Sequence, residues 1–208
     1  MEHKNPAART FPLLLVTLTV YFLLWQLFSL YFDLPPYYYA RLIEFLSILL
    51  FAALALFTPM QFEKMGILTD RQTLMRSLAL GGGIALGAVC ILSVLSLLRG
   101  SSPFMYPPYN GDVSRVTYIL VAPLQEVLSK SVMYHSVELC FEEKHPHLTN
   151  VLCALLFAIF HVVYGLRMML LSMALSLLTG LVFRKFRCVW GCAVVHFSLG
   201  FFPACFGF

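Results

Sequence analysis

A carboxylate and an ammonium lie inside an apolar run of this sequence. Glu126 and Lys130 are four residues apart in a stretch that otherwise reads as buried. Each charge costs roughly 2.5–3.5 kcal/mol on membrane-insertion scales, so an ionisable residue in hydrocarbon usually faces a cavity or a bundle interior and serves function. A helix that begins near Pro123 places both side chains on one face, where they can pair. We expect the Lys130 charge to be neutralised by Glu126 or by backbone carbonyls.

Two histidines also interrupt apolar runs of the sequence. His161 ends the stretch 157–161, and His196 lies within the stretch 193–200. Either one alone would more often be a hydrogen-bonded core residue. Together with Glu126 they supply a sufficient set for hydrolysis, because one group can deprotonate water while others donate to the developing oxyanion. His and carboxylate side chains also bind zinc, but the sequence lacks an HExxH pattern and does not establish a metal site.

The apolar runs that carry these residues are long enough to be membrane helices. Hydrophobic residues make up 60% of the chain and charged residues only 12%, against about 25% charged residues in soluble domains. One span needs roughly 20 mainly apolar residues. The sequence therefore predicts an all-α, polytopic membrane bundle of about seven spans, at residues 11–32, 40–60, 77–98, 116–140, 148–164, 166–183 and 188–202.

The chain divides into two parts of one integral bundle. We assign residues 1–115 to N-terminal transmembrane helices and loops, and residues 116–208 to a core that carries the polar side chains. The glycines at 81–83 in the third span predict close packing against a neighbouring helix. Arg41 and Glu44 are three residues apart near the start of the second span, so we expect an interfacial pair there rather than a catalytic one. The long connection at 99–115 is expected to be a loop outside the membrane.

Basic residues lie in the short gaps between the apolar runs rather than in a patch. Such residues set the orientation of a membrane protein, and nucleic acid is not expected as a partner. If the N-terminus is cytoplasmic, nine Lys and Arg residues fall inside and four outside, with Lys130 counted as within the membrane. The distribution predicts a multi-pass integral membrane protein with a cytoplasmic N-terminus, which we expect in the inner membrane of a prokaryotic cell.

The segment from Ala122 to Gly200 resembles the CPBP intramembrane proteases, also called the Abi family. This family includes the type II prenyl-protein proteases that trim CAAX-terminal proteins. Its pattern is Glu-Glu-x-x-x-Arg, then Phe-x-x-x-His, then His-x-x-x-Asn on successive membrane helices. Phe157 to His161 match the second motif in full, and His196 matches the first half of the third. The spans before this segment carry no motif.

The first motif is where the chain departs from the family. Alignment on Lys130 puts Gln125 in place of the first Glu, whereas alignment on Pro123 makes Glu126 the first Glu and loses the second. Either alignment leaves one acid. In the third motif Gly200 cannot supply the Asn amide, and Gln125 is the residue that could partly replace it as a donor.

The resemblance implies an intramembrane endopeptidase that hydrolyses a membrane-anchored or membrane-proximal peptide within the lipid bilayer. It implies that Glu126 and His161 activate water and that His196 stabilises the oxyanion. Supporting roles fall to the other motif positions, Gln125, Lys130, Phe157 and Gly200. The resemblance implies catalysis without a cofactor, while a divalent metal such as zinc stays open.

The departures from the motifs keep a second function class open. A weakened or inactive homologue would be a membrane scaffold or a bacteriocin-immunity factor, in which the three polar residues only tie helices together. A proton-coupled transporter would also place Glu and His within the membrane. The sequence has no internal repeat of the kind that many transporters show.

Overall fold

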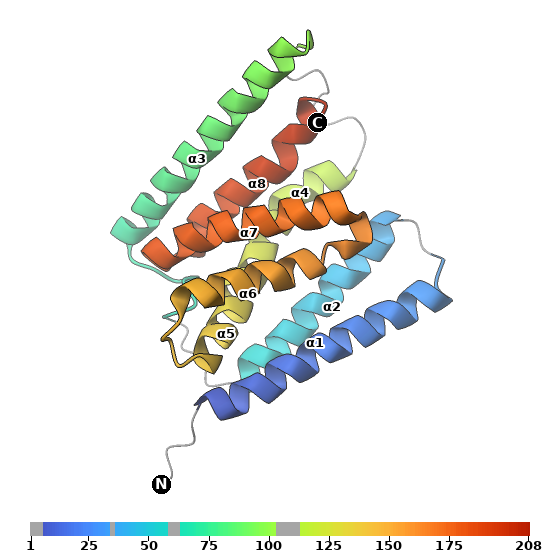
Figure 1. Cartoon of the computed structure of the whole chain (residues 1–208), viewed down its shortest axis with the longest axis vertical. Helices are drawn as coiled ribbons and strands as arrows, with labels where there is room; N and C mark the ends of the chain where they lie inside the picture. The colour runs from blue at the N-terminus through green and yellow to red at the C-terminus, as the bar shows by residue number, and fades with distance from the viewer. Residues whose placement is uncertain (1–5, 34–35, 58–62, 103–112) are drawn as a thin grey trace.

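The described residues of this computed structural model, 6–33, 36–57, 63–102 and 113–208, form a bundle of helices (Figure 1). The N-terminal part contains α1 (Pro6–Tyr31), α2 (Pro36–Phe57) and α3 (Arg71–Leu98). The C-terminal part contains α4 (Val113–Glu126), α5 (Tyr134–Cys140), α6 (Pro146–Ile159), α7 (Leu166–Phe186) and α8 (Val189–Cys205). A π-helical segment, η1 (Val127–Met133), joins α4 to α5, and a 3-10 turn, η2 (Val162–Tyr164), follows α6. The all-α fold is confirmed, and each predicted span is a helix if α4, η1 and α5 are counted as one rod.

The helix ends follow from local backbone chemistry. Pro36 and Pro146 each begin a helix, where a residue without an N–H group loses nothing. The Asp70 side chain caps α3 by accepting a hydrogen bond of 3.0 Å from the backbone N–H of Thr73. Gly165, with a φ of 88°, turns the chain between η2 and α7, and this conformation favours glycine. The long predicted connection at 99–115 lies mostly outside the described residues.

The helices are arranged with α3 and α1 on the two flanks and the others between them (Figure 1). The most extensive packing joins α3 to α8, α6 to α7, α4 to α8 and α1 to α5. The buried apolar core lies where α5 and η1 meet α1, α2, α6, α7 and α8. It consists of Leu14, Phe51, Met65, Val132, Met133, Tyr134, Val137, Cys153, Phe157, Val182, Phe183 and Cys192.

Backbones of α3 and α8 approach closely at one of the predicted glycines. A Cβ atom on Gly81 would lie 2.4 Å from the carbonyl oxygen of Gly191, and one on Gly191 would lie 2.3 Å from the Ser77 carbonyl oxygen. Small residues are therefore required at this helix crossing, as is common in membranes. A Cβ atom on Gly82 or on Gly83 would have no neighbouring atom within 4 Å. Only Gly81, the first glycine of the run, makes the close contact.

The outer surface of the bundle is apolar. Exposed side chains on α1 and α3 include Leu23, Leu30, Leu86 and Ile91, each more than 60% accessible. Three helical stretches of the described chain, Thr10–Tyr31, Arg71–Leu98 and Leu166–Phe186, are long and apolar enough to cross a membrane, and shorter apolar helices include α6 and α8. Because contiguous apolar surface of this size requires lipid or partner contact, the chain is an integral membrane protein.

Three of the basic links gather at one end of the bundle. Lys64, in the link before α3, forms an ion pair with Glu143, in the link before α6. Arg187, between α7 and α8, donates to Glu138 of α5 at 2.8 Å. The N–H of Val189 donates to the Gly66 carbonyl oxygen at 3.0 Å, which ties the first link to the third. These links therefore share one membrane face.

Candidate functional site

The rod from Val113 to Cys140 changes its helical winding directly after Glu126. Pro123 lies inside α4, so no helix begins near this residue, whereas the predicted span from residue 116 begins close to the observed start at Val113. Within η1 the hydrogen bonds reach one residue further than in an α-helix, as from the Tyr134 N–H to the Ser129 carbonyl oxygen. Short π-helical segments are frequent at functional sites because they turn side chains out of the α-helical register.

This change of winding redirects Lys130. Its ammonium is fully buried and donates to the Oγ of Ser176 at 2.8 Å and to the carbonyl oxygen of Ser176 at 2.9 Å. The expected side-chain pair with Glu126 is not among the ion pairs of the described residues. The two side chains instead bond to different helices, Lys130 to Ser176 of α7 and Glu126 to His196 of α8. Of the two expected ways to neutralise Lys130, the backbone carbonyl is the one present.

Glu126 instead pairs with His196 across the bundle. Its Oε1 atom lies 2.8 Å from Nδ1 of His196, on α8, and both residues are buried. An ionised carboxylate can only accept, so Nδ1 of His196 carries the hydrogen. The second oxygen, Oε2, has no hydrogen-bond partner in the described part of the chain. The bond fixes the orientation of the His196 ring and leaves Nε2 as its other hydrogen-bonding atom.

His161 lies just after α6 and is fixed by a bond to its own helix. Its Nδ1 atom is 2.8 Å from the carbonyl oxygen of Phe157. A carbonyl only accepts, so Nδ1 carries the hydrogen and Nε2 of the neutral ring has a free lone pair. The ring is thereby oriented as a proton acceptor.

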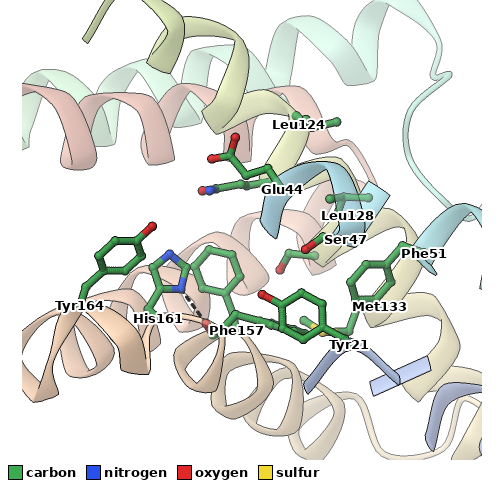
Figure 2. A pocket seen from close by; sticks show the side chains of 13 residues that line it. Tyr21, Glu44, Ser47, Phe51, Leu124, Leu128, Met133, Phe157, His161 and Tyr164 are labelled. Carbon is green, nitrogen blue, oxygen red and sulfur yellow. Dashed lines mark hydrogen bonds between the residues drawn. The ribbon is translucent and has the colours of Figure 1, made fainter. Parts of the chain in front are cut away.

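A cavity lies beside this ring (Figure 2). The space between the surrounding atoms is about 660 Å³, which includes its open mouth. Residues from α1, α2, α4, η1 and α6 to η2 line it: Tyr21, Glu44, Ser47, Phe51, Leu124, Gln125, Leu128, Ser129, Met133, Phe157, Phe160, His161 and Tyr164. His161 and Gln125 therefore face the cavity, whereas Glu126 and His196 lie behind its wall.

Phe157 separates the two polar groups. Its ring centroid is 4.6 Å from that of His161 and 5.8 Å from that of His196. The two imidazoles are close enough to act on each other electrostatically. Thus the predicted residues form a cavity-facing part, His161 with Gln125, and a buried part, Glu126 with His196, on either side of one aromatic ring.

Steric contact with Tyr118 explains why position 200 carries a glycine. A Cβ atom there would lie 1.9 Å from the hydroxyl oxygen of Tyr118, on α4. The Tyr118 ring also lies 6.2 Å from the His196 ring and stacks on Phe197. The phenol therefore occupies the space that a side chain at Gly200 would need, one helical turn beyond His196.

Two polar residues of the cavity were missed by sequence reasoning. Glu44 of α2 pairs with Arg41 at 2.8 Å, as expected, yet its carboxylate also lines the cavity (Figure 2). Ser129 of η1 is 3% exposed, and its Oγ has no hydrogen-bond partner in the described chain. A carboxylate within an apolar run was visible in the sequence, but the packing of α2 against η1 was not.

The donor set does not fit a metal centre of the usual kind. The described residues contain no group of three His, Cys, Asp or Glu side chains that could hold a metal ion. Catalytic zinc requires three protein ligands. We therefore derive no step that involves a metal.

Comparison with known proteins agrees with the sequence motifs. Residues 113–202 match the family model described as Rce1-like, type II CAAX prenyl endopeptidase Rce1-like. No curated protein and no solved structure gives a significant match to the chain. The matched residues run from α4 into α8 and include every residue that the motifs singled out. Residues 113–202 of this integral membrane protein are therefore similar to the Rce1-like type II CAAX prenyl endopeptidases, and the similarity covers less than half of the chain.

Proposed function

We propose that the chain is an intramembrane endopeptidase that hydrolyses a membrane-anchored or membrane-proximal peptide in the cavity beside His161. One observation carries the proposal: the Nδ1 atom of His161 is bonded to the Phe157 carbonyl oxygen at 2.8 Å, which leaves Nε2 as a proton acceptor in an enclosed, mainly apolar space. An oriented imidazole of this kind is a suitable general base near neutral pH.

The reaction needs a proton acceptor and a donor. In the proposed mechanism, Nε2 of His161 takes a proton from water while the water oxygen attacks the scissile carbonyl carbon, and the carbonyl electron pair moves to oxygen. The tetrahedral species then collapses, the C–N bond breaks, and the proton passes to the leaving amine. The products are a carboxylic acid and an amine, which exchange a proton to give a carboxylate and an ammonium group, so one water is consumed for each bond cleaved.

Glu126 acts through His196 in this proposal. The resemblance assigns Glu126 to water, but its hydrogen bond to Nδ1 of His196 supports a different division of labour. The bond to the carboxylate fixes the ring of His196, which in its protonated form can donate from Nε2 to negative charge on the substrate oxygen. His196 would reach that oxygen past the edge of Phe157, whose ring contacts both imidazoles.

The lining of the cavity supports a membrane-anchored substrate. Apolar and aromatic side chains such as Phe51, Met133 and Phe160 make up most of its wall, with few polar groups between them. Such a wall desolvates an apolar segment next to the scissile bond, and it raises the strength of the electrostatic contacts inside.

A non-catalytic function is favoured by one observation. Gln125, which alignment on Lys130 puts at the first acidic position of the motif, faces the cavity and cannot accept a proton from water. A scaffold or immunity factor would use the cavity or the polar residues only for binding and packing.

Turnover by purified protein in lipid vesicles separates the two functions. Membrane-anchored peptides of varied C-terminal sequence are offered to the parent, to His161→Ala and to His147→Ala as a matched control near the surface. We expect cleavage by the parent and the control, and at least about a 100-fold loss in His161→Ala. Equal activity of all three folded proteins would contradict the role of His161, and absence of cleavage by the parent would favour the scaffold.

A further inference from the structure

The cavity lacks a carboxylate from the motif helix. Gln125 is the only member of the Gln125–Glu126 pair that lines it, because Glu126 is turned to His196. An amide donates and accepts hydrogen bonds, but it does not take a proton at neutral pH. His161 would therefore be the sole base on the motif helices that faces a water in the cavity.

Glu44 places a carboxylate in the same cavity from outside the motif region. It comes from α2, which packs against η1, and its side chain is about one-fifth exposed. Figure 2 shows its carboxylate and the His161 ring bordering the same open space. The Arg41 guanidinium donates to Oε1 of Glu44 at 2.8 Å, and this contact compensates an ionised carboxylate and limits its rotation.

A second observation indicates that the cavity holds a polar ligand. Ser129 lines it with a hydroxyl that is buried and has no partner within the described chain. A buried hydroxyl without a hydrogen bond is destabilising, because it has lost its contacts with water and gained no partner. Water or a substrate amide in the cavity would satisfy it, which places such a molecule between η1 and the Glu44 and His161 groups.

We propose that Glu44 is a catalytic residue that activates the hydrolytic water together with His161. This inference rests on the proposed endopeptidase function. A water has two hydrogens to donate, and the Glu44 carboxylate and Nε2 of His161 accept one each, so a lone pair of the water oxygen is directed at the substrate. As that oxygen bonds to the carbonyl carbon, one acceptor takes the proton and the carbonyl electron pair moves to oxygen. The same proton passes to the amine nitrogen when the C–N bond breaks.

The test compares steady-state turnover in lipid vesicles of the parent, Glu44→Gln and the surface control Glu63→Gln. Glu44→Gln keeps the shape and the bond to Arg41 but removes the proton acceptor. We expect kcat to fall by at least about 100-fold with KM within about twofold, since the loss affects only the reaction step. The control should match the parent.

Two further variants separate catalysis from structure. Glu44→Asp keeps the charge but shortens the side chain by one methylene, and we expect kcat to fall by about tenfold or more while the melting temperature is kept. Combining Glu44→Gln with Gln125→Glu returns a carboxylate to the cavity from α4. The kcat of this double variant should be at least about tenfold higher than that of Glu44→Gln alone.

The outcomes distinguish this inference from the proposed function. Parent-like kcat in Glu44→Gln, with His161→Ala inactive, would overturn the role of Glu44 and leave the endopeptidase intact. A loss in Glu44→Gln that appears in KM alone, without recovery in the double variant, would show a binding role and also overturn it. If the parent cleaves no peptide, the proposed function itself fails and the inference with it.

Discussion

The ammonium of Lys130 lies 2.8 Å from the hydroxyl oxygen of Ser176 and 2.9 Å from its carbonyl oxygen. A fully buried cation of the η1 segment is thus held by a neutral residue of α7 and not by the carboxylate four residues before it. The contact ties the π-helical segment η1 to α7.

We expect Ser176→Ala to lower the free energy of unfolding by about 1.5–3 kcal/mol, the usual loss for a hydrogen bond to a charged donor. In a Lys130→Met background the same change should have little effect, because the donor is absent. Ser172→Ala is the matched control, since the Ser172 hydroxyl bonds only within α7, to the Met169 carbonyl oxygen. Thermal unfolding in detergent measures the cycle. Equal effects of Ser176→Ala in both backgrounds would show that the two residues do not interact.

Gly200→Ala should destabilise the bundle by about 1–3 kcal/mol, the usual cost of overpacking. The new methyl group would lie 1.9 Å from the Tyr118 hydroxyl oxygen and 2.7 Å from the adjacent ring carbon. In a Tyr118→Ala background, where the ring is absent, Gly200→Ala should cause no further loss of stability. Gly83→Ala is the control, because its Cβ meets no atom within 4 Å and alanine favours the helix. A melting temperature for Gly200→Ala at or above that of Gly83→Ala would contradict the contact.

The N-terminus of α3 should respond to acid. Hydrogen bonds from the Thr73 side chain and backbone N–H hold the pKa of Asp70 below its ordinary value of 3.8. A group whose pKa is depressed by folding contributes stability above its unfolded pKa, and that stability is lost as the pH falls through the folded pKa. The parent should therefore be more stable than Asp70→Asn near neutral pH, and the difference should disappear below about pH 4. Melting temperatures across this range measure it, and a constant difference would contradict the linkage.

Hydropathy predicted the helices of this fold because the length of an apolar run is a local property. The seven predicted runs match the helical rods, including the one that contains Glu126. The sequence could not show the π-helical winding of η1, and of the two expected ways to neutralise Lys130 the structure has the backbone carbonyl rather than Glu126. That winding depends on tertiary contacts, such as the bond from Lys130 to Ser176 on another helix.

The site was predictable only as far as its motifs extend. Glu126, His161 and His196 were found from their types and spacing, and their catalytic roles stay predictions. Glu44 was assigned to the interface because its pair with Arg41 is local, whereas its place in the cavity depends on how α2 packs. The absence of a side chain at Gly200 looked like a lost function in the sequence, but the structure has the Tyr118 phenol in that space.

We predict that the face with the basic links is cytoplasmic. The links that contain Lys64, Lys144 and Arg187 lie at one end of the bundle, and positive residues favour the cytoplasmic side. In a background without the native cysteines, Lys144→Cys should react with a membrane-impermeant thiol reagent only after the cells are permeabilised. Ser102→Cys, beyond the other end of α3, should react in intact cells. The reverse pattern would invert the orientation.

The pairing of Glu126 with His196 predicts that their contributions to catalysis are not additive. If Glu126 acts by holding His196 in place, Glu126→Gln removes the effect of both residues, because a neutral amide oxygen is a weaker acceptor than a carboxylate. We expect each of Glu126→Gln and His196→Ala to lower kcat by about 100-fold or more. The double variant should then be no slower than the slower single variant.

Thermal unfolding must confirm that each variant is folded, because His196→Ala leaves the buried Glu126 carboxylate without its partner. Turnover of the same membrane-anchored peptide measures the cycle, with and without a chelator. Losses that multiply in the double variant would show that Glu126 acts independently of His196, for example on water directly. Loss of parent activity in the chelator would return a metal to the mechanism, which the donor set of the described residues does not lead us to expect.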